Sequence, residues 1–220
     1  MIAEAVVGER RASPNNQSDA RAGAYSELIV NDSGLGRYFE AVRYGRVFTT
    51  ISKAVTVAAT HNSPIAANTA TPVLGVGNVS FGFAMVLLRA AIVTTSGTPA
   101  GGQVVLNLQA NAVNPITATA TGSIFNNLLG GPSSQMKALN NVALAGWLAT
   151  PSAVQEHALL GGATAAAAAG NGGPGPAGED LGGLYIVPPG GLVAIMAGSG
   201  AGTSWIVNAS LTWAEVNWPL

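Results

Sequence analysis

The residues that could carry acid, base or metal chemistry are few in this chain. It holds two histidines, His61 and His157, and no cysteine. A catalytic triad needs a histidine that is oriented by a carboxylate and lies beside a nucleophile on a strained turn. Neither histidine has that setting, because His61 lies in a polar turn and His157 simply follows Glu156 as an exposed polar pair. Two histidines without a cysteine also make a poor zinc site, so no metal-binding residue is predicted.

Paired carboxylates are the other route to catalysis, since two acidic side chains can hydrolyse a glycosidic bond. Beyond residue 53 the acidic residues are Glu156, Glu179, Asp180 and Glu215. Glu179 and Asp180 border a segment that is predicted to be a loop, and a loop is a poor platform for precise geometry. Glu215 lies near the end of the chain. A small glycan hydrolase is therefore the least supported function, and no catalytic residue is predicted.

The glycine-rich segments do not indicate a cofactor. Residues 75–80 begin like a dinucleotide-binding fingerprint, but the third glycine is missing and no strand–helix–strand unit surrounds them. The sequence contains no P-loop. We therefore interpret residues 75–80 as a turn, and no cofactor-binding residue is predicted.

The charged residues are distributed very unevenly. Seven basic and six acidic residues lie in residues 1–53, whereas only six charged residues lie in residues 54–220. Charged residues make up 9% of the chain, against a usual value of about 25%. An isolated soluble domain normally carries mixed charge to stay dispersed. This pattern favours a body that is covered in an assembly, although a surface of Ser, Thr, Asn, Gln and Gly is the alternative.

The net charge of −1 gives no electrostatic basis for binding nucleic acid. In one segment, arginines alternate with aromatic residues in a way that could suit single-stranded nucleic acid. Contact with a neighbouring subunit is the better interpretation of this segment, because the overall charge is neutral. The predicted interaction residues are Arg37, Tyr38, Phe39, Arg43, Tyr44, Arg46 and, near the other terminus, Trp218.

The elements that must position these residues are predicted to be strands. Residues 47–51, 55–57, 72–76 and 104–109 are rich in β-branched residues, and Gly, Pro and Asn turns separate them. Residues 83–88 are apolar on both faces, which predicts a fully covered central strand, with a buried helical turn as the alternative. The longest apolar stretch, residues 81–93, is too short to span a bilayer, and no signal peptide or membrane association is expected.

The C-terminal region gives the clearest pattern. Residues 184–187 and 192–196 are predicted strands, and between residues 205 and 213 every second side chain is apolar or aromatic. Trp205 and Trp213 therefore belong to one buried face rather than to a sugar-binding platform. The fold class is predicted to be all-β: an antiparallel β-sandwich, jelly-roll-like, with an extended N-terminal arm.

The predicted domains are an arm at residues 1–45 and a sandwich at residues 46–220, with a Gly/Ala/Pro-rich loop at residues 161–180. The alanines could form about two helical turns, but the Gly/Pro part can continue neither a helix nor a strand. The sequence leaves the role of residues 1–35 open.

Several short segments, in their order along the chain, resemble virion-associated proteins that tailed bacteriophages encode. They are residues 36–40 (GRYFE), 44–48 (YGRVF), 71–76 (TPVLGV), 134–138 (SQMKA), 184–191 (LYIVPPGG) and 211–216 (LTWAEV). The resemblance implies a non-enzymatic structural protein of the particle, above all a capsid cement (decoration) protein. It carries over no catalytic residue.

We therefore expect a homo-oligomer, most simply a homotrimer, that binds the phage major capsid protein. Such a protein would be made in the bacterial host cytoplasm and would act on the capsid surface of the virion. The alternative is a receptor- or carbohydrate-binding module of a tail or fibre, with recognition by Trp147 and the loop at residues 161–180.

Overall fold

The structure is a computed structural model that describes residues 21–22, 28–29, 38–57, 72–97, 102–109, 121–140, 155–163, 177–197 and 205–218. The chain divides into two units, Met1–Glu40 and Ala41–Leu220. In the first unit, β1 (Arg21–Ala22) pairs antiparallel with β2 (Leu28–Ile29). Most of the predicted arm lies outside the described residues. The second unit contains the sandwich.

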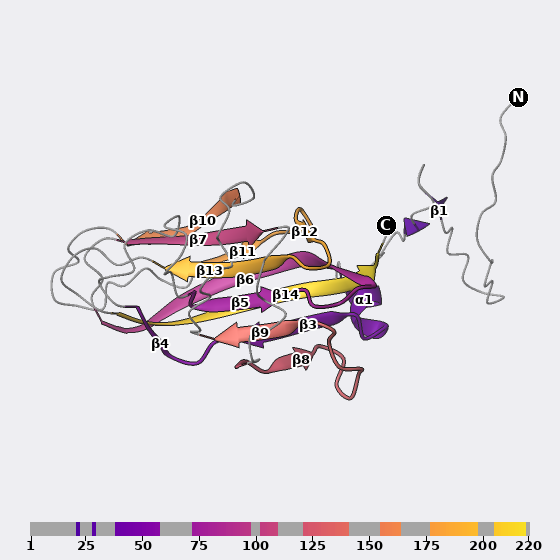
Figure 1. The fold of residues 1–220 in the computed structure, drawn as a ribbon, viewed down its shortest axis with the longest axis horizontal. Coiled ribbons are helices and arrows are strands. Elements are labelled where there is room, and N and C mark those ends of the chain that lie inside the picture. Colours follow the sequence, from indigo (N-terminus) through magenta and orange to yellow (C-terminus); the bar gives the residue numbers. More distant parts are fainter. Residues whose placement is uncertain are drawn as a thin grey trace, which may run out of the picture. The chain divides into compact units, whose positions relative to one another are not determined.

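Eight strands of the second unit form a long antiparallel hairpin that is rolled up into two sheets (Figure 1). In chain order they are β3 (Val47–Ile51), β5 (Leu74–Gly77), β6 (Phe83–Gly97), β7 (Gly102–Gln109), β10 (Gln155–Ala163), β11 (Ala177–Asp180), β13 (Leu192–Ala197) and β14 (Trp205–Asn217). Their pairs are nested, because β7 pairs with β10, β6 with β11, β5 with β13, and β3 with β14. This nesting is the topology of a jelly roll, so the predicted all-β antiparallel sandwich is confirmed.

The two sheets differ in size. The five-stranded sheet has the order β10-β7-β13-β5-β9, and the path of the seven-stranded sheet is β11-β6-β14-β3-β8. Two short strands complete the larger sheet: β12 (Ile186–Val187) pairs with β6, and β4 (Val55–Val57) pairs with β14. The two sheets place β10 and β11 on one side of the sandwich, where these strands contact each other.

An insertion between β7 and β10 closes the opposite side. We call residues 121–140 the insertion. Its strand β8 (Ile124–Asn126) pairs with β3, and its strand β9 (Lys137–Asn140) pairs with β5. The insertion therefore adds one edge strand to each sheet, and both lie at the same edge of the sandwich (Figure 1).

The core lies between the sheets and follows the predicted alternation of β14. Val207, Ala209, Leu211 and Trp213 are buried, while the residues between them are half-buried. The ring of Trp213 stacks on Phe48 of β3 with centroids 6.2 Å apart. Fully burying an aromatic side chain of this size contributes on the order of 2–3 kcal/mol through the hydrophobic effect alone.

The first secondary-structure element of the sandwich unit departs from the sequence prediction. An extended arm was expected up to residue 45, but α1 (Phe39–Arg43) is a single helical turn. It ends in a Schellman motif, because the amide of Arg46 donates to Ala41 O (3.0 Å) and that of Gly45 to Val42 O (2.8 Å). Gly45 has a φ of 65°, a conformation that favours glycine. This glycine explains why the helix stops before β3.

The predicted loop at residues 161–180 is wrong at both ends. Residues 161–163 complete β10, and Ala177–Asp180 form β11; residues 164–176 lie outside the described part of the chain. Alanine and glycine have low strand propensity, so the pairing with β7 and β6 decides these ends. In the described ranges, no helix is long and apolar enough to cross a membrane.

Candidate functional site

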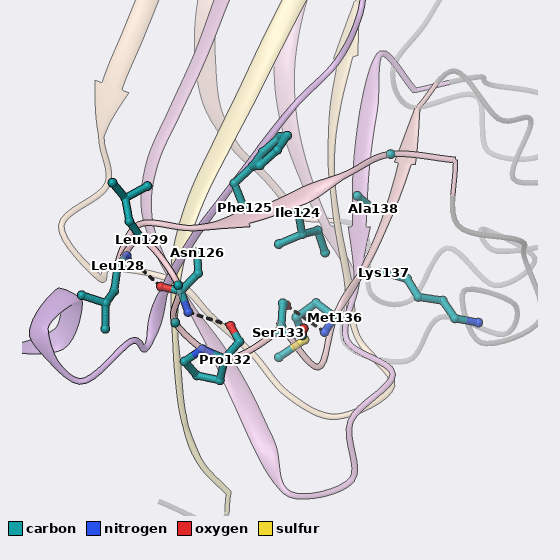
Figure 2. Close-up of a pocket in the computed structure, with 14 residues that line it drawn as sticks. Ile124, Phe125, Asn126, Leu128, Leu129, Pro132, Ser133, Met136, Lys137 and Ala138 are labelled. Carbon is teal, nitrogen blue, oxygen red and sulfur yellow. Dashed lines mark hydrogen bonds between the residues drawn. The ribbon is translucent and has the colours of Figure 1, made fainter.

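The insertion shapes an open pocket of about 500 Å³ at the edge where β8 and β9 lie. Figure 2 shows its lining side chains, with Phe125 and Ile124 on β8 and Met136 close to the start of β9. The lining combines apolar side chains with the polar Asn126, Ser133 and Ser134. Lys137 extends away from the other lining side chains (Figure 2). Pockets of 300–1,000 Å³ with mostly apolar walls are typical binding sites.

Asn126 holds the pocket wall in place. Its amide nitrogen donates to Pro132 O (2.8 Å) and to Gly45 O (2.9 Å), and its amide oxygen accepts from the Leu128 amide (2.8 Å). Gly131 lies so close that an added Cβ would come within 2.7 Å of the Asn126 side chain. The wall is therefore built by hydrogen bonds and a close approach that only glycine permits.

A tight turn presents the most exposed apolar side chain of this region. The amide of Gly131 donates to Leu128 O (2.8 Å), and Gly130 between them has a φ of 77°. A positive φ at the third residue of a turn is the signature of type II geometry. Leu129, the second residue of the turn, is 95% exposed. The turn therefore holds Leu129 at the surface, outside the core.

A buried carboxylate anchors the other end of the pocket wall. Glu215 of β14 is 5% exposed and accepts hydrogen bonds from the Ser134 hydroxyl and from the Gln135 amide (3.2 Å). The indole of Trp213 also donates to it (3.4 Å). These donors satisfy the carboxylate, as a buried charge requires. The contacts make Glu215 a positioning residue for the insertion.

Four of the predicted interaction residues lie at one end of the sandwich. Backbone hydrogen bonds hold the segments that carry them together: Glu215 N donates to Arg46 O (2.8 Å), and Trp218 N donates to Gly82 O (2.8 Å). Arg46 also lies over the ring of Tyr44, 6.0 Å from its centroid. All of these side chains are exposed, together with Phe81 at 89% and Leu129. We call this set the end patch: Arg43, Tyr44, Arg46, Phe81, Leu129 and Trp218.

The remaining predicted interaction residues belong to the other unit, Met1–Glu40. Arg37 lies outside the described residues, and Tyr38 and Phe39 belong to the Met1–Glu40 unit, where Phe39 is 40% exposed. Sequence reasoning missed Phe81 and Leu129. The only local signal for Leu129 was the Gly130-Gly131-Pro132 turn, and Phe81 follows a serine with no distinctive pattern.

The residues considered for catalysis are dispersed. His61 lies outside the described residues, and His157 lies in β10. Trp147, which was predicted to take part in ligand recognition, also lies outside the described residues. Glu179 and Asp180 are exposed on β11, where Asp180 accepts a hydrogen bond from the Gly182 amide (3.0 Å). Within the part of the chain that the structure describes, no three His, Cys, Asp or Glu side chains gather as a metal site would require.

The chain matches no protein-family model, no curated protein and no solved structure.

Proposed function

We propose that this protein is a non-enzymatic structural component of a tailed-bacteriophage particle, specifically a capsid cement protein. It self-associates, most simply as a homotrimer, and binds the major capsid protein on the outer surface of the head. The observation that carries the proposal is the end patch, which gathers exposed aromatic and aliphatic side chains with two arginines on an otherwise charge-poor body.

The composition of the end patch fits a protein partner. Aromatic residues and arginine are enriched at protein interfaces, and a fixed apolar patch on a soluble domain usually marks a contact surface. The described acidic residue nearest to it along β14, Glu215, is buried against the insertion. The exposed charge of the patch is therefore basic, which suits an acidic shell surface.

The arm adds reach to this contact. Residues 1–53 hold 13 of the 19 charged residues, and a charged segment can extend along neighbouring shell subunits. A segment that orders on contact gains reach at the expense of affinity per unit area. Many copies on one shell then strengthen binding through avidity. The resemblance to virion-associated phage proteins supports the same assignment.

Co-sedimentation with emptied phage heads tests the proposal. We expect the full chain to sediment with heads, and the double variant Tyr44→Asp/Phe81→Asp to lose at least tenfold in apparent affinity. Ile51→Asp is the matched control, because Ile51 is also exposed but lies on a sheet face away from the end patch. Deletion of residues 1–36 should abolish binding and leave the sandwich folded. Wild-type binding by both the double variant and the deletion would overturn the proposal.

The pocket favours a second candidate function, a receptor- or carbohydrate-binding module of a tail or fibre. Its volume would accept a small ligand, but its lining contains one aromatic side chain, Phe125. Binding on a glycan array that Phe125→Ala removes, without any binding to heads, would favour this candidate over the cement protein.

A further inference from the structure

The two lateral edges of the sandwich differ in shape: one has a pocket, and the other has protruding apolar side chains. One edge has the pocket of the insertion. The other edge has an apolar knob, because β12 and the residue two before it expose Ile186 (45%) and Leu184 (72%) next to β6. Figure 1 shows β12 and β8 at opposite sides of the sandwich. A knob on one edge and a pocket on the other are complementary between two copies of the same chain.

The same two edges differ in charge. On the knob side, Glu179 and Asp180 are exposed on β11, with Arg89 as the one basic residue of the neighbouring strand β6. The described bases near the pocket edge are Arg46, Lys53 and Lys137, which flank β3 or begin β9. Their nearest acid, Glu215, is buried. One edge is thus net acidic and the other net basic.

The register places the knob and the pocket at the same height along the strands. Ile186 pairs with Val86, Val86 with Ala214, and Ala214 with Val47. The amide of Asn127, the first residue after β8, then donates to Val47 O (2.9 Å). A single row of backbone partners therefore crosses the seven-stranded sheet from the knob to the pocket wall, over four strand spacings of about 4.8 Å each.

Equal height decides what kind of assembly can form. A knob and a pocket on different parts of one chain make a head-to-tail contact, which builds either a closed ring or an open filament. Rotation about an axis leaves the height along that axis unchanged. Contacts at equal height do not climb along that axis, so a rotation between successive copies closes them into a ring whose axis runs parallel to the strands. Contacts at unequal height climb into a filament.

We infer that the protein forms a closed ring in which Leu184 and Ile186 of one copy enter the insertion pocket of the next copy, with the acidic edge against the basic edge. This inference deepens the proposed function, because it rests on the self-association proposed there and assigns the surfaces that perform it. Apart from Leu129, which also lines the pocket, the end patch remains available to the shell, since its Phe81 and Trp218 lie at the end of the strands rather than at either edge.

Two variants with complementary defects test the ring. Leu184→Asp/Ile186→Asp removes the knob, and Phe125→Asp/Leu128→Asp spoils the pocket without changing the end patch. Light scattering during size-exclusion chromatography of the full-length chain should show each variant as a monomer. Their equimolar mixture at high concentration should give a dimer, because one intact knob and one intact pocket remain and neither free side can extend. The dimer itself shows that both variants fold.

The controls separate this inference from other assemblies. Phe81→Asp changes an equally exposed apolar residue and should keep the wild-type oligomer, and raising the ionic strength should weaken the ring because it screens the two edges. Knob and pocket variants that keep the wild-type mass would overturn the ring, as would dissociation by Ile51→Asp alone. A wild-type chain that is monomeric yet sediments with heads would overturn the ring and leave the proposed shell binding intact.

Discussion

The two sheets of the sandwich differ in how much their strands are exposed to solvent. In the five-stranded sheet, every residue of β5 and β13 is buried, although only one face of that sheet can pack on the other sheet. In the seven-stranded sheet, β14 alternates, with Leu211 and Trp213 in the core and Ser210 and Thr212 half-buried on the outer face. The five-stranded sheet is the covered layer, and the seven-stranded sheet keeps one face open.

The five-stranded sheet is therefore a scaffold, and the seven-stranded sheet offers an accessible surface. The outer face of the seven-stranded sheet is held by hydrogen bonds between small side chains, such as the 3.1 Å contact between the hydroxyls of Thr49 and Thr212. The buried faces of the five-stranded sheet have no such freedom, because any change in volume or polarity is felt by packed neighbours. Function is therefore expected at the edges and the end of the larger sheet.

The largest effect should come from placing a charge on the outward side of the five-stranded sheet, compared with the same change on the seven-stranded sheet. Ala194 alternates with the core residues Val193 and Ile195 and is still fully buried, whereas Ser210 is half-buried. Ala194→Asp buries an unpaired carboxylate, so we expect a loss of more than about 4 kcal/mol in the free energy of unfolding. Ser210→Asp should stay within about 1 kcal/mol. Urea titration measures both, and equal losses would refute the contrast between the sheets.

A deletion of apolar volume gives the next largest effect. Leu139 of β9 is fully buried although it is not part of the central hydrophobic core, whereas Ile51 of β3 is 52% exposed. Leu139→Ala should cost about 2–5 kcal/mol because it leaves a cavity. Ile51→Ala should cost less than about 0.5 kcal/mol. Thermal unfolding of the two variants side by side provides the measurement, and a larger loss for Ile51→Ala would reverse the comparison.

A smaller effect should follow when the anchor of the insertion is weakened. Glu215→Gln keeps the size of the side chain but removes the negative charge that receives the Ser134, Gln135 and Trp213 donors. Hydrogen bonds to a charged group contribute about 1.5–3 kcal/mol, so we expect a loss in that range.

Hydrogen exchange should locate the effect of Glu215→Gln in the insertion, with faster exchange of the Gln135 and Met136 amides. Glu179→Gln is the matched control, because Glu179 is exposed, and it should change neither stability nor exchange. Uniform exchange of the insertion in both variants would show that Glu215 does not anchor it.

The smallest effect concerns the backbone beside the pocket. Gly45→Ala must hold an alanine at a φ of 65° with its Cβ 2.8 Å from Pro132 Cδ, so we expect a loss of about 1–2 kcal/mol. An added Cβ at Gly82 would meet no atom within 4 Å, and Gly82→Ala should be neutral or slightly stabilising. Chemical denaturation distinguishes the two, and a neutral Gly45→Ala would mean that the helix end and the insertion adjust independently of each other.

The strands that the sequence predicted are those whose pattern is local. β3, β4, β5, β7 and β13 lie where β-branched or continuous apolar residues indicated them, and β6 runs through the predicted central strand at residues 83–88. The edge strands were missed for a physical reason. β10 and β11 consist largely of small or polar residues, and pairing with β7 and β6 makes them strands.

The candidate site was predictable only in part. Tyr44, Arg46 and Trp218 were selected as exposed contacts from their types, and the structure places them at one end of the sandwich. Phe81 and Leu129 escaped prediction, because an isolated apolar residue in a sequence is more often buried than exposed. Only the folded turns that carry them determine that these two side chains face solvent.

The sequence by itself determined the fold class, the buried face of β14 and the division into a charged N-terminal region and a charge-poor body, because these follow from periodicity and composition along the chain. Only the tertiary structure decided the nested order of the strands and the pocket of the insertion. It also decided that Ile186, at the opposite edge of the sheet, lies at the same height along the strands as the pocket. Those features depend on contacts between residues far apart in the chain, such as Thr49 and Thr212, which are 163 positions apart. No local pattern encodes which distant strands will pair.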